Sequence, residues 1–338
     1  MSGNFAFLAE ELGRDPVRTV HSVLHGRVKV RRPVREMVTL PRELAEAEAI
    51  VLDDYYPLVY SLVLRPSTRL VQVWHAAGAY KRVGFSRRGL PGGPFPGSNI
   101  HRGYTHAIAS SELVRADIAD AFGMDIDDVH ALGIPRTDAF FDAEHLAKTR
   151  RDVRDRLGLS ADVRVILFAP TFRGNGQVSA HYDYSLVDWQ ALSDGLEEGA
   201  VVLVKMHPFV RDPFPLAADP RFLDVGAERE INDLIMASDV LVTDYSSLIF
   251  ETALLRLPCI LFVPDLQEYV RARSFYHRFE EYSYGQIATT STELVQAVCA
   301  PVVDEVRLTA FLERFMSACD GRSTERVVRQ LLPAGPLP

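Results

Sequence analysis

Polar side chains follow an apolar segment near residue 240, in an order that suits phosphate binding. The segment DVLVTD (239–244) runs into Tyr245, Ser246 and Ser247. Its consecutive Val and Leu residues predict a parallel strand that is buried on both faces, and a serine suits the N-cap of the helix that follows. The free N–H groups and the helix dipole at such a helix start attract anions. An ordinary strand-to-helix turn with a serine cap is the alternative.

A histidine follows the apolar segment LVQVW (70–74). His75 is succeeded by small residues up to Ala79, which allow the backbone to turn closely around a ligand. A histidine in this position can act as a general base near pH 7. The alternative is a hydrogen-bonded histidine beneath a turn.

Two further apolar segments end in cations or hydroxyls. Thr171 and Arg173 follow VILF, and the planar fork of an arginine suits phosphate oxygens. Lys205 and His207 follow VVLV and would share one face of an extended strand. A polar loop and a capped strand end remain the alternative interpretations of these two segments.

The elements that would position these residues alternate between strand-like and helix-like segments, which predicts an α/β protein with parallel sheets. Helices are expected at 111–122, 143–158 and, once or twice, after 303; a long loop is expected at 85–103. Strands are expected at 49–54, 70–74, 105–110, 128–133, 163–170, 200–208, 239–244 and 259–265. Because ligands bind beyond the carboxyl ends of such strands, the polar residues should surround one cleft. An anion-binding helix, an arginine and two histidines suit a diphosphate-linked donor.

Composition excludes several classes of protein. The 338 residues are enough for two domains, and the net charge of −8 argues against general nucleic-acid binding. The three cysteines lie far apart, so a reducing cytoplasm is expected, and no apolar run approaches 18 residues. P-loop, GxGxxG, HExxH and CxxC motifs are absent, so no tightly bound metal or cofactor is indicated, and Asp53 and Asp54 are interpreted as a polar strand end.

One stretch of the chain, residues 18–35, contains no acidic residue. We expect it to form a solvated basic face, or else a patch that meets an anionic membrane or a polyanionic acceptor. Its cations, which we call the basic block, are Arg18, Arg27, Lys29, Arg31, Arg32 and Arg35.

Taken together, these segments resemble the CDP-glycerol glycerophosphotransferases, the teichoic acid primases and polymerases of bacterial envelopes. The resemblance covers roughly residues 50 to 275. The matching segments are VQVWHAAGAYKRVG (71–84), GIPRTDAFF (133–141), APTFRG (169–174), VKMHP (204–208) and ASDVLVTDYSSLIFETALLRLPCILFVPDLQEY (237–269). Members usually have a first strand before the segment that SGNFAFLAEEL matches, so we expect a trimmed first domain or a start that lies upstream.

The resemblance implies a GT-B fold, in which two Rossmann-like domains face a central cleft. The implied domains are an acceptor-side domain (1–145), a CDP-donor-binding domain (146–302) and closing helices (303–338). His75 would act as base on the acceptor hydroxyl, His207 would stabilise the leaving phosphate, and Gly78 and Lys81 would lie on the acceptor side. The expected donor-binding residues are Thr171, Arg173, Lys205, Thr243, Asp244, Ser246 and Ser247.

The expected function is transfer of glycerol phosphate or ribitol phosphate from CDP-glycerol or CDP-ribitol. The acceptor would be a hydroxyl of a teichoic-acid-like or capsule polymer or of its lipid-linked precursor, at the cytoplasmic face of the membrane, and CMP would be released. One alternative is a GT-B glycosyltransferase that uses a nucleotide sugar. Another is a binding module without turnover, against which the two histidines argue.

Overall fold

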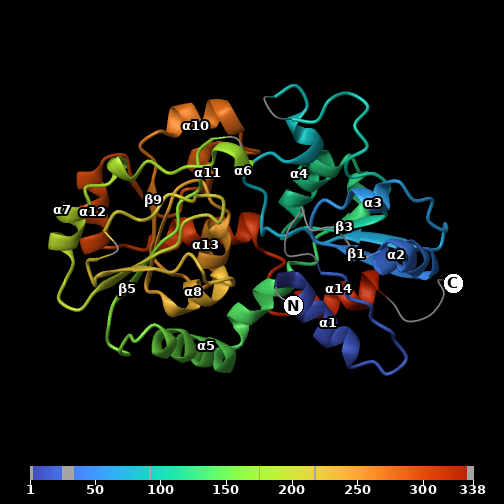
Figure 1. The fold of residues 1–338 in the computed structure, drawn as a ribbon, viewed down its shortest axis with the longest axis horizontal. Coiled ribbons are helices and arrows are strands. Elements are labelled where there is room, and N and C mark those ends of the chain that lie inside the picture. Colours follow the sequence, from blue (N-terminus) through green and yellow to red (C-terminus); the bar gives the residue numbers. More distant parts are fainter. Residues whose placement is uncertain (1–2, 25–33, 91–92, 175, 217, 333–338) are drawn as a thin grey trace. The chain divides into compact units, whose positions relative to one another are not determined.

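The computed structural model describes residues 3–24, 34–90, 93–174, 176–216 and 218–332, and it divides into two compact units (Figure 1). The first unit comprises residues 1–138 and 315–338, and the second comprises 139–314. Helix α5 (Ala143–Arg156) therefore lies wholly in the second unit, whereas the last helix returns to the first. These boundaries differ from those expected at 145 and 302 because the chain ends pack by tertiary contacts that local patterns do not report.

The first unit is built on a parallel sheet whose strand order, β1-β2-β3-β4, follows the chain. The four expected strands are confirmed, each shorter than the segment that predicted it. The strands are β1 (Ala49–Leu52), β2 (Arg69–Gln72), β3 (His106–Ile108) and β4 (Val129–His130). The helices are α1 (Gly3–Gly13), α2 (Val34–Glu46), α3 (Pro57–Tyr60), η1 (Gly84–Arg87), α4 (Glu112–Phe122), η2 (Ile126–Asp128) and α14 (Ser323–Leu331). The 3-10 helix η3 (Pro135–Phe141) leads into the second unit.

The GIPRTD segment (133–138) fastens the C-terminal helix to the first unit. The carboxylate of Asp138 accepts hydrogen bonds from the backbone N–H groups of Ser323 (2.9 Å) and Thr324 (2.7 Å), so it caps the start of α14. Gly133 has a φ of 80°, and a Cβ built on it would lie 2.3 Å from the carbonyl oxygen of Ala318. The segment therefore has a structural role, and only glycine fits at its first position.

The second unit contains a six-stranded parallel sheet in the order β10-β9-β8-β5-β6-β7. Read from β7 to β10 and numbered from 1 to 6 along the chain, this is the doubly wound order 3-2-1-4-5-6 of a Rossmann sheet. The strands are β5 (Val165–Phe168), β6 (Val201–Val204), β7 (Phe222–Asp224), β8 (Val240–Thr243), β9 (Cys259–Phe262) and β10 (Gln286–Ala288). The helices are α5, α6 (Gly176–Ser179), η4 (Tyr184–Leu186), α7 (Trp189–Gly195), α8 (Ile231–Ala237), α9 (Leu248–Leu254), α10 (Leu266–Arg273), α11 (Phe279–Tyr282), α12 (Ser291–Cys299) and α13 (Glu305–Phe315).

The four central strands of this sheet are buried along their whole length, as their continuous apolar runs predict. Cys259 belongs to this core. The edge strands β7 and β10 were not expected. Each has three residues and only one buried position, so neither produces a recognisable apolar run.

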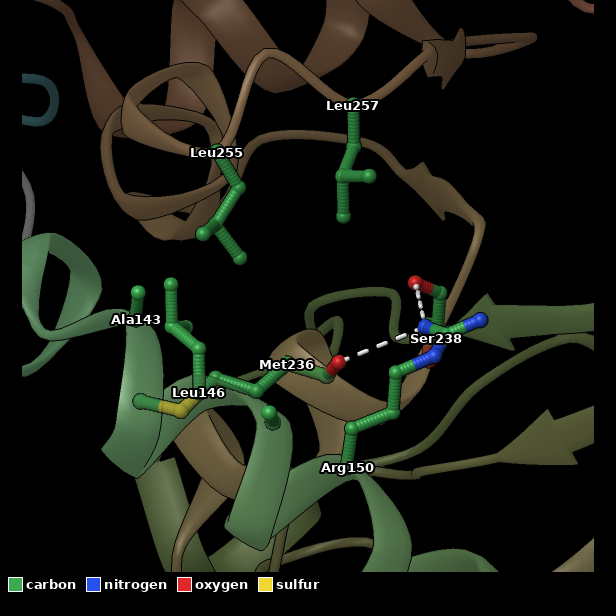
Figure 2. Close-up of a pocket in the computed structure, with 8 residues that line it drawn as sticks. Ala143, Leu146, Arg150, Met236, Ser238, Leu255 and Leu257 are labelled. Carbon is green, nitrogen blue, oxygen red and sulfur yellow. Dashed lines mark hydrogen bonds between the residues drawn. The ribbon is translucent and has the colours of Figure 1, made fainter. Parts of the chain in front are cut away.

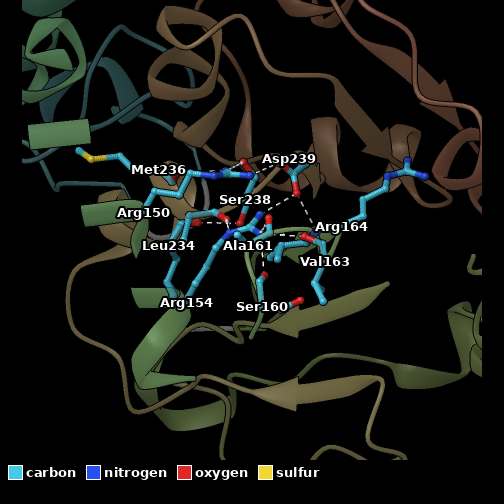
Figure 3. A network of polar contacts seen from close by, with 12 residues as sticks. Arg150, Arg154, Ser160, Ala161, Val163, Arg164, Leu234, Met236, Ser238 and Asp239 are labelled. Atoms are coloured by element: carbon cyan, nitrogen blue, oxygen red, sulfur yellow. Dashed lines mark hydrogen bonds and ion pairs between the residues drawn. The ribbon is translucent and has the colours of Figure 1, made fainter. Parts of the chain in front are cut away.

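A buried arginine fixes α5 to the sheet (Figure 3). Arg154 donates to the carbonyl oxygens of Ala237 (3.0 Å) and Val163 (2.8 Å), and to the carboxylate of Asp239 (2.9 Å). The same carboxylate oxygen accepts the N–H of Val165 (2.8 Å) at the start of β5. This network joins the entrances of β5 and β8 and thereby sets the position of the two strands that carry the candidate donor residues.

Candidate functional site

The first candidate group lies at the turn that follows β2. The Nδ1 atom of His75 is 3.1 Å from the carbonyl oxygen of Asp53. A carbonyl oxygen can only accept, so in the neutral ring this contact places the proton on Nδ1 and leaves a lone pair on Nε2. The side chain is about half exposed, with 53% of its surface accessible. This tautomer at an accessible position suits a general base.

The acidic pair at the end of β1 lies beside His75, a proximity that the sequence interpretation missed. Asp53 supplies the carbonyl, and the Asp54 carboxylate lies 3.8 Å from Nδ1. Burial raises the pKa of the Asp53 carboxyl, and this effect outweighs the opposite one of His75. The sequence showed only that the acidic pair and His75 each follow an expected strand; the structure shows that these two strands are neighbours, with Leu52 paired to Gln72.

The remaining residues expected on this side lie on the same turn. Gly78 has a φ of 65°, a conformation that glycine adopts without strain, and Lys81 is partly buried three residues later. Their contribution to acceptor binding stays a prediction.

The second candidate group follows β5 and β8, the two strands at which the order of the Rossmann sheet reverses. Asp244 is its centre: its Oδ1 accepts hydrogen bonds from the N–H (2.8 Å) and hydroxyl (2.9 Å) of Thr171 and from the N–H of Tyr245 (2.6 Å). Thr243 donates its hydroxyl to the carbonyl oxygen of Ala169 (2.7 Å). These bonds hold the ends of the two strands together.

Arg173 is bound by two carboxylates, which the sequence interpretation did not foresee. Its Nε and Nη2 donate to Asp265 at 2.6 and 3.0 Å, and its Nη1 donates to Asp244 at 2.9 Å. Burial alone would lower the pKa of the guanidinium, but the carboxylates raise it above its ordinary value. The planar group also lies over the rings of Tyr245 (5.1 Å) and Tyr269 (4.9 Å).

This arrangement makes Arg173 an internal support of the candidate site. One cation between two carboxylates leaves the cluster with a net charge of −1, which does not by itself attract phosphate. Asp265 stands at the end of the segment CILFVPD, so its place after an expected strand was the signal that could have identified it.

The ammonium group of Lys205 is also bound by groups of the protein itself. Its Nζ donates to the carbonyl oxygens of Gly226 (2.8 Å) and Glu228 (2.7 Å), and burial lowers its pKa. The lysine therefore ties β6 to the loop that follows β7, and its ammonium is held by carbonyl oxygens there.

His207 presents the tautomer opposite to that of His75. Its Nδ1 accepts a hydrogen bond from the backbone N–H of Phe209 (3.2 Å), so in the neutral ring the proton is on Nε2. The imidazole packs against the rings of Phe172 and Phe209, each with a centroid distance of 4.6 Å. The neutral ring of His207 thus carries its hydrogen-bond donor on Nε2, and such a group suits contact with a phosphate oxygen.

The two serines of the expected helix start have different positions. Ser246 accepts the N–H of Leu248 through its hydroxyl (3.3 Å). Ser247 is the N-cap of α9, but its backbone is helical and its side chain makes no capping bond. Both are partly buried, and their contact with a donor stays a prediction.

A separate apolar hollow of about 310 Å³ lies in the second unit (Figure 2). Its lining includes Ser238 and Leu257, which precede β8 and β9. The hollow therefore lies at the N-terminal ends of these strands, whereas the candidate donor residues follow the C-terminal ends. The other lining residues are Ala143, Leu146, Ala147, Arg150, Met236 and Leu255. Arg150, its one cation, donates to the carbonyl oxygen of Ser238 (3.1 Å), so the hollow offers no catalytic group.

Three further expectations concern a metal site, a membrane-spanning helix and the basic block. Within the described ranges, no group of three His, Cys, Asp or Glu side chains is arranged to hold a metal ion. None of the described helices has the length and apolar character needed to cross a bilayer. Arg18 of the basic block pairs with Asp15 at 2.9 Å. The other members fall outside the described residues: Arg27, Lys29, Arg31, Arg32 and the side chain of Arg35.

Comparison with known proteins confirms the resemblance seen in the motifs. The model of the family described as CDP-Glycerol:Poly(glycerophosphate) glycerophosphotransferase matches residues 1–333. The teichoic acid poly(ribitol-phosphate) polymerase of Bacillus spizizenii is 41% identical over 335 residues, which are 98% of this chain and 54% of that protein. The teichoic acid ribitol-phosphate polymerase TarK of Staphylococcus aureus is 40% identical over 337 residues, which are 98% of this chain and 66% of that protein. The chain thus spans between about half and two thirds of the length of these relatives.

The structure is similar to that of the wall teichoic acid polymerase TagF. The TM-score is 0.77 at 22% identity, over 98% of this chain and 85% of that chain. At this identity the likeness is one of fold, an α/β architecture with parallel sheets.

Proposed function

This chain belongs to the CDP-glycerol:poly(glycerophosphate) glycerophosphotransferase family, and on that premise we propose that it transfers a polyol phosphate from a CDP-activated donor to a hydroxyl of an anionic envelope or capsule polymer or its lipid-linked precursor. The observation that carries the proposal is topological. Most of the expected donor residues follow β5 and β8, the two strands between which the strand order reverses, and a doubly wound sheet binds nucleotides at that position. Lys205 and His207 follow β6, the next strand beside β5.

The proposed step is a displacement at the phosphorus that bears the polyol. The acceptor oxygen forms a new bond to this β-phosphorus, the bond from the phosphorus to the bridging oxygen breaks, and CMP leaves with that oxygen. The proton of the acceptor hydroxyl passes to Nε2 of His75, and the Nε2–H of His207 donates to a phosphate oxygen. Positioning and charge neutralisation supply most of the rate in such transfers.

The two tautomers support this division of roles. Nδ1 of His75 is occupied by the Asp53 carbonyl, so the lone pair available to a substrate is on Nε2. Nδ1 of His207 accepts the Phe209 N–H, so in the neutral ring Nε2 is the hydrogen-bond donor. A general base and a hydrogen-bond donor to the phosphate are the two groups that the displacement requires.

The supporting cluster around Asp244 has a different proposed role. Thr171, Arg173 and Asp244 hold the two strand ends at a fixed separation, and Ser246 and Ser247 follow directly. We assign direct contact with the donor diphosphate to the two serines and to His207. Arg173, Lys205, Thr243 and Asp244 would act by keeping these groups in place.

Ribitol phosphate is the proposed group. The two relatives at 40% and 41% identity are both named as ribitol-phosphate polymerases, which favours CDP-ribitol over CDP-glycerol as donor. The proposal includes the GT-B arrangement that the resemblance implies, with the acceptor bound by the first domain and the donor by the second, at the cytoplasmic face of the membrane. Two parallel α/β units and the likeness to TagF support it.

The test is release of CMP from CDP-ribitol and from CDP-glycerol, each with a lipid-linked or polymeric anionic acceptor. Acceptor-dependent release from CDP-ribitol is expected, with His75→Gln and His207→Gln each lowering the rate by about 10²- to 10⁴-fold. His145→Gln, at an exposed position of α5, is the matched control and should retain full activity.

Binding measurements separate the two histidine roles. His75→Gln should bind CDP-ribitol as the wild type does, whereas His207→Gln should bind it more weakly. No CMP from either donor, together with turnover of a UDP-sugar, would replace the proposal with the nucleotide-sugar glycosyltransferase.

A further inference from the structure

The backbone at the turn of the candidate base is unusual. Trp74, which precedes His75, has a φ of 49°, in the left-handed region that a side chain with a Cβ disfavours. The indole and imidazole rings lie 4.2 Å apart between centroids, so the conformation of Trp74 also sets the direction of His75. Such a conformation persists only where the surroundings impose it.

Two buried amides impose it. The Oε1 of Gln72 accepts the N–H of Trp74 at 2.8 Å, and the Nδ2 of Asn4 donates to the Trp74 carbonyl oxygen at 2.6 Å. Gln72 is 0% exposed and Asn4 is 2% exposed. Both polar groups of one strained residue are therefore held by side chains, one from β2 itself and one from α1.

Each amide is oriented in turn by a second partner. The Oδ1 of Asn4 accepts the backbone N–H of Arg136 at 3.0 Å, so its Nδ2 must face Trp74. The Nε2 of Gln72 donates to the hydroxyl of Tyr104 at 2.9 Å, so its Oε1 must face Trp74. Neither amide can rotate by 180° without losing two hydrogen bonds.

The hydroxyl of Tyr104 completes the arrangement. It lies 2.6 Å from the hydroxyl of Tyr60 and 3.0 Å from Nδ1 of His101. The hydroxyl oxygen of Tyr60 accepts the N–H of Tyr56 at 3.1 Å, so its O–H can donate a hydrogen bond to Tyr104. The O–H of Tyr104 can in turn donate a hydrogen bond to Nδ1 of His101. Burial lowers the pKa of His101 to about 4, so the ring is neutral at pH 7 and its Nδ1 can accept.

We propose that Asn4, Gln72 and Tyr104 are positioning residues for His75. They hold Trp74 in its left-handed conformation, and thereby direct Nδ1–H of His75 at the Asp53 carbonyl and Nε2 at the substrate. The consequence for catalysis rests on the proposed function. The expected effect on the tautomer of His75 is independent of the proposed function.

The test uses two variants of increasing severity and one control, in the full chain. Tyr104→Phe removes the hydroxyl that accepts from Gln72 and leaves Nε2 of Gln72 only its longer bond to the Asp54 carbonyl oxygen (3.3 Å). Gln72→Met removes the acceptor of the Trp74 N–H. Tyr284→Phe is the control, because Tyr284 is also buried but its hydroxyl donates to the carbonyl oxygen of Ile249 in the second unit (3.0 Å).

The first readout is the ¹⁵N NMR signature of the His75 imidazole, assigned with His75→Gln. The wild type and Tyr284→Phe should show the Nδ1–H tautomer. Gln72→Met should show a mixture of tautomers, and Tyr104→Phe a smaller shift in the same direction. An unchanged His75 tautomer in both folded variants would overturn the proposal, and Tyr104→Phe decides alone if Gln72→Met does not fold.

The second readout is CMP release from CDP-ribitol. We expect kcat to fall about fivefold in Tyr104→Phe and about fiftyfold in Gln72→Met, with KM for the donor within threefold of the wild type, because misplacement of a catalytic group by about 1 Å costs up to 10²-fold. A shifted tautomer in a protein whose wild type has no turnover would refute the proposed function and leave the positioning inference standing.

Discussion

Replacing Arg173 by lysine distinguishes a supporting residue from a phosphate ligand. Lysine keeps the positive charge but has no planar fork, so it cannot reproduce the paired bonds to Asp265 together with the bond to Asp244. The arginine side chain is 16% exposed and that of Asp244 is 3% exposed, so solvent does little to replace what is lost.

The expected loss follows from the bonds that lysine cannot make. Three charge-assisted hydrogen bonds reach the carboxylates, and a lysine ammonium keeps one of them. Each such bond contributes about 1.5 to 3 kcal/mol, so after partial relaxation the free energy of unfolding should fall by about 3 kcal/mol. For a unit of this size that corresponds to a decrease in Tm of roughly 10 °C.

The assay is thermal unfolding of Arg173→Lys, followed by titration with CDP-ribitol at a temperature where the variant is folded. Arg278→Lys is the control, because the Arg278 side chain is 80% exposed. Asp265→Asn and the double variant complete a cycle, in which strong coupling is expected because the two residues share one ion pair. A Tm within 2 °C of the wild type, combined with a large loss of donor affinity, would refute the supporting role and restore Arg173 as a direct phosphate ligand.

Three other predictions test the fold around the candidate site. The wild type should lose stability between pH 7 and pH 4.5 through the protonation of His101, and His101→Asn should lack this loss. Because the folded pKa of His101 is lowered to about 4, the unfolded state takes up the proton first as pH falls below about 6.5, which costs the wild type about 2 to 3 kcal/mol in acid unfolding measurements. Gly133→Ala should fail to fold or lose more than about 10 °C in Tm, because its Cβ meets the carbonyl oxygen of Ala318. Gly158→Ala, also at positive φ but in open space, should show only the smaller loss that the backbone strain causes. Arg154→Met should lower the free energy of unfolding by about 3 to 5 kcal/mol, measured by urea titration, because Asp239 and several carbonyl oxygens lose a buried donor.

The residues that the sequence placed at strand ends divide into two classes in the structure. In His75 and in His207, Nδ1 is held by a backbone group, which fixes the tautomer of the neutral ring. Arg173 and Lys205 have the residue types of phosphate ligands, but they bind carboxylates and carbonyl oxygens of the protein itself. Residue type and spacing alone do not distinguish these classes, because both need the same cations at the same strand ends.

The sequence by itself determined the α/β class, the central strands and the position of the candidate residues beyond the strand ends. These features follow from apolar runs and from the chemistry of strand-to-helix turns, which are local along the chain. Only the tertiary structure decided which strands are neighbours, that Asp265 reaches back 92 positions to Arg173, and which ring nitrogen of His75 carries its proton. The physical reason is that a side-chain pair or a tautomer depends on groups that are distant in sequence and adjacent in space, and a local pattern contains no information about them.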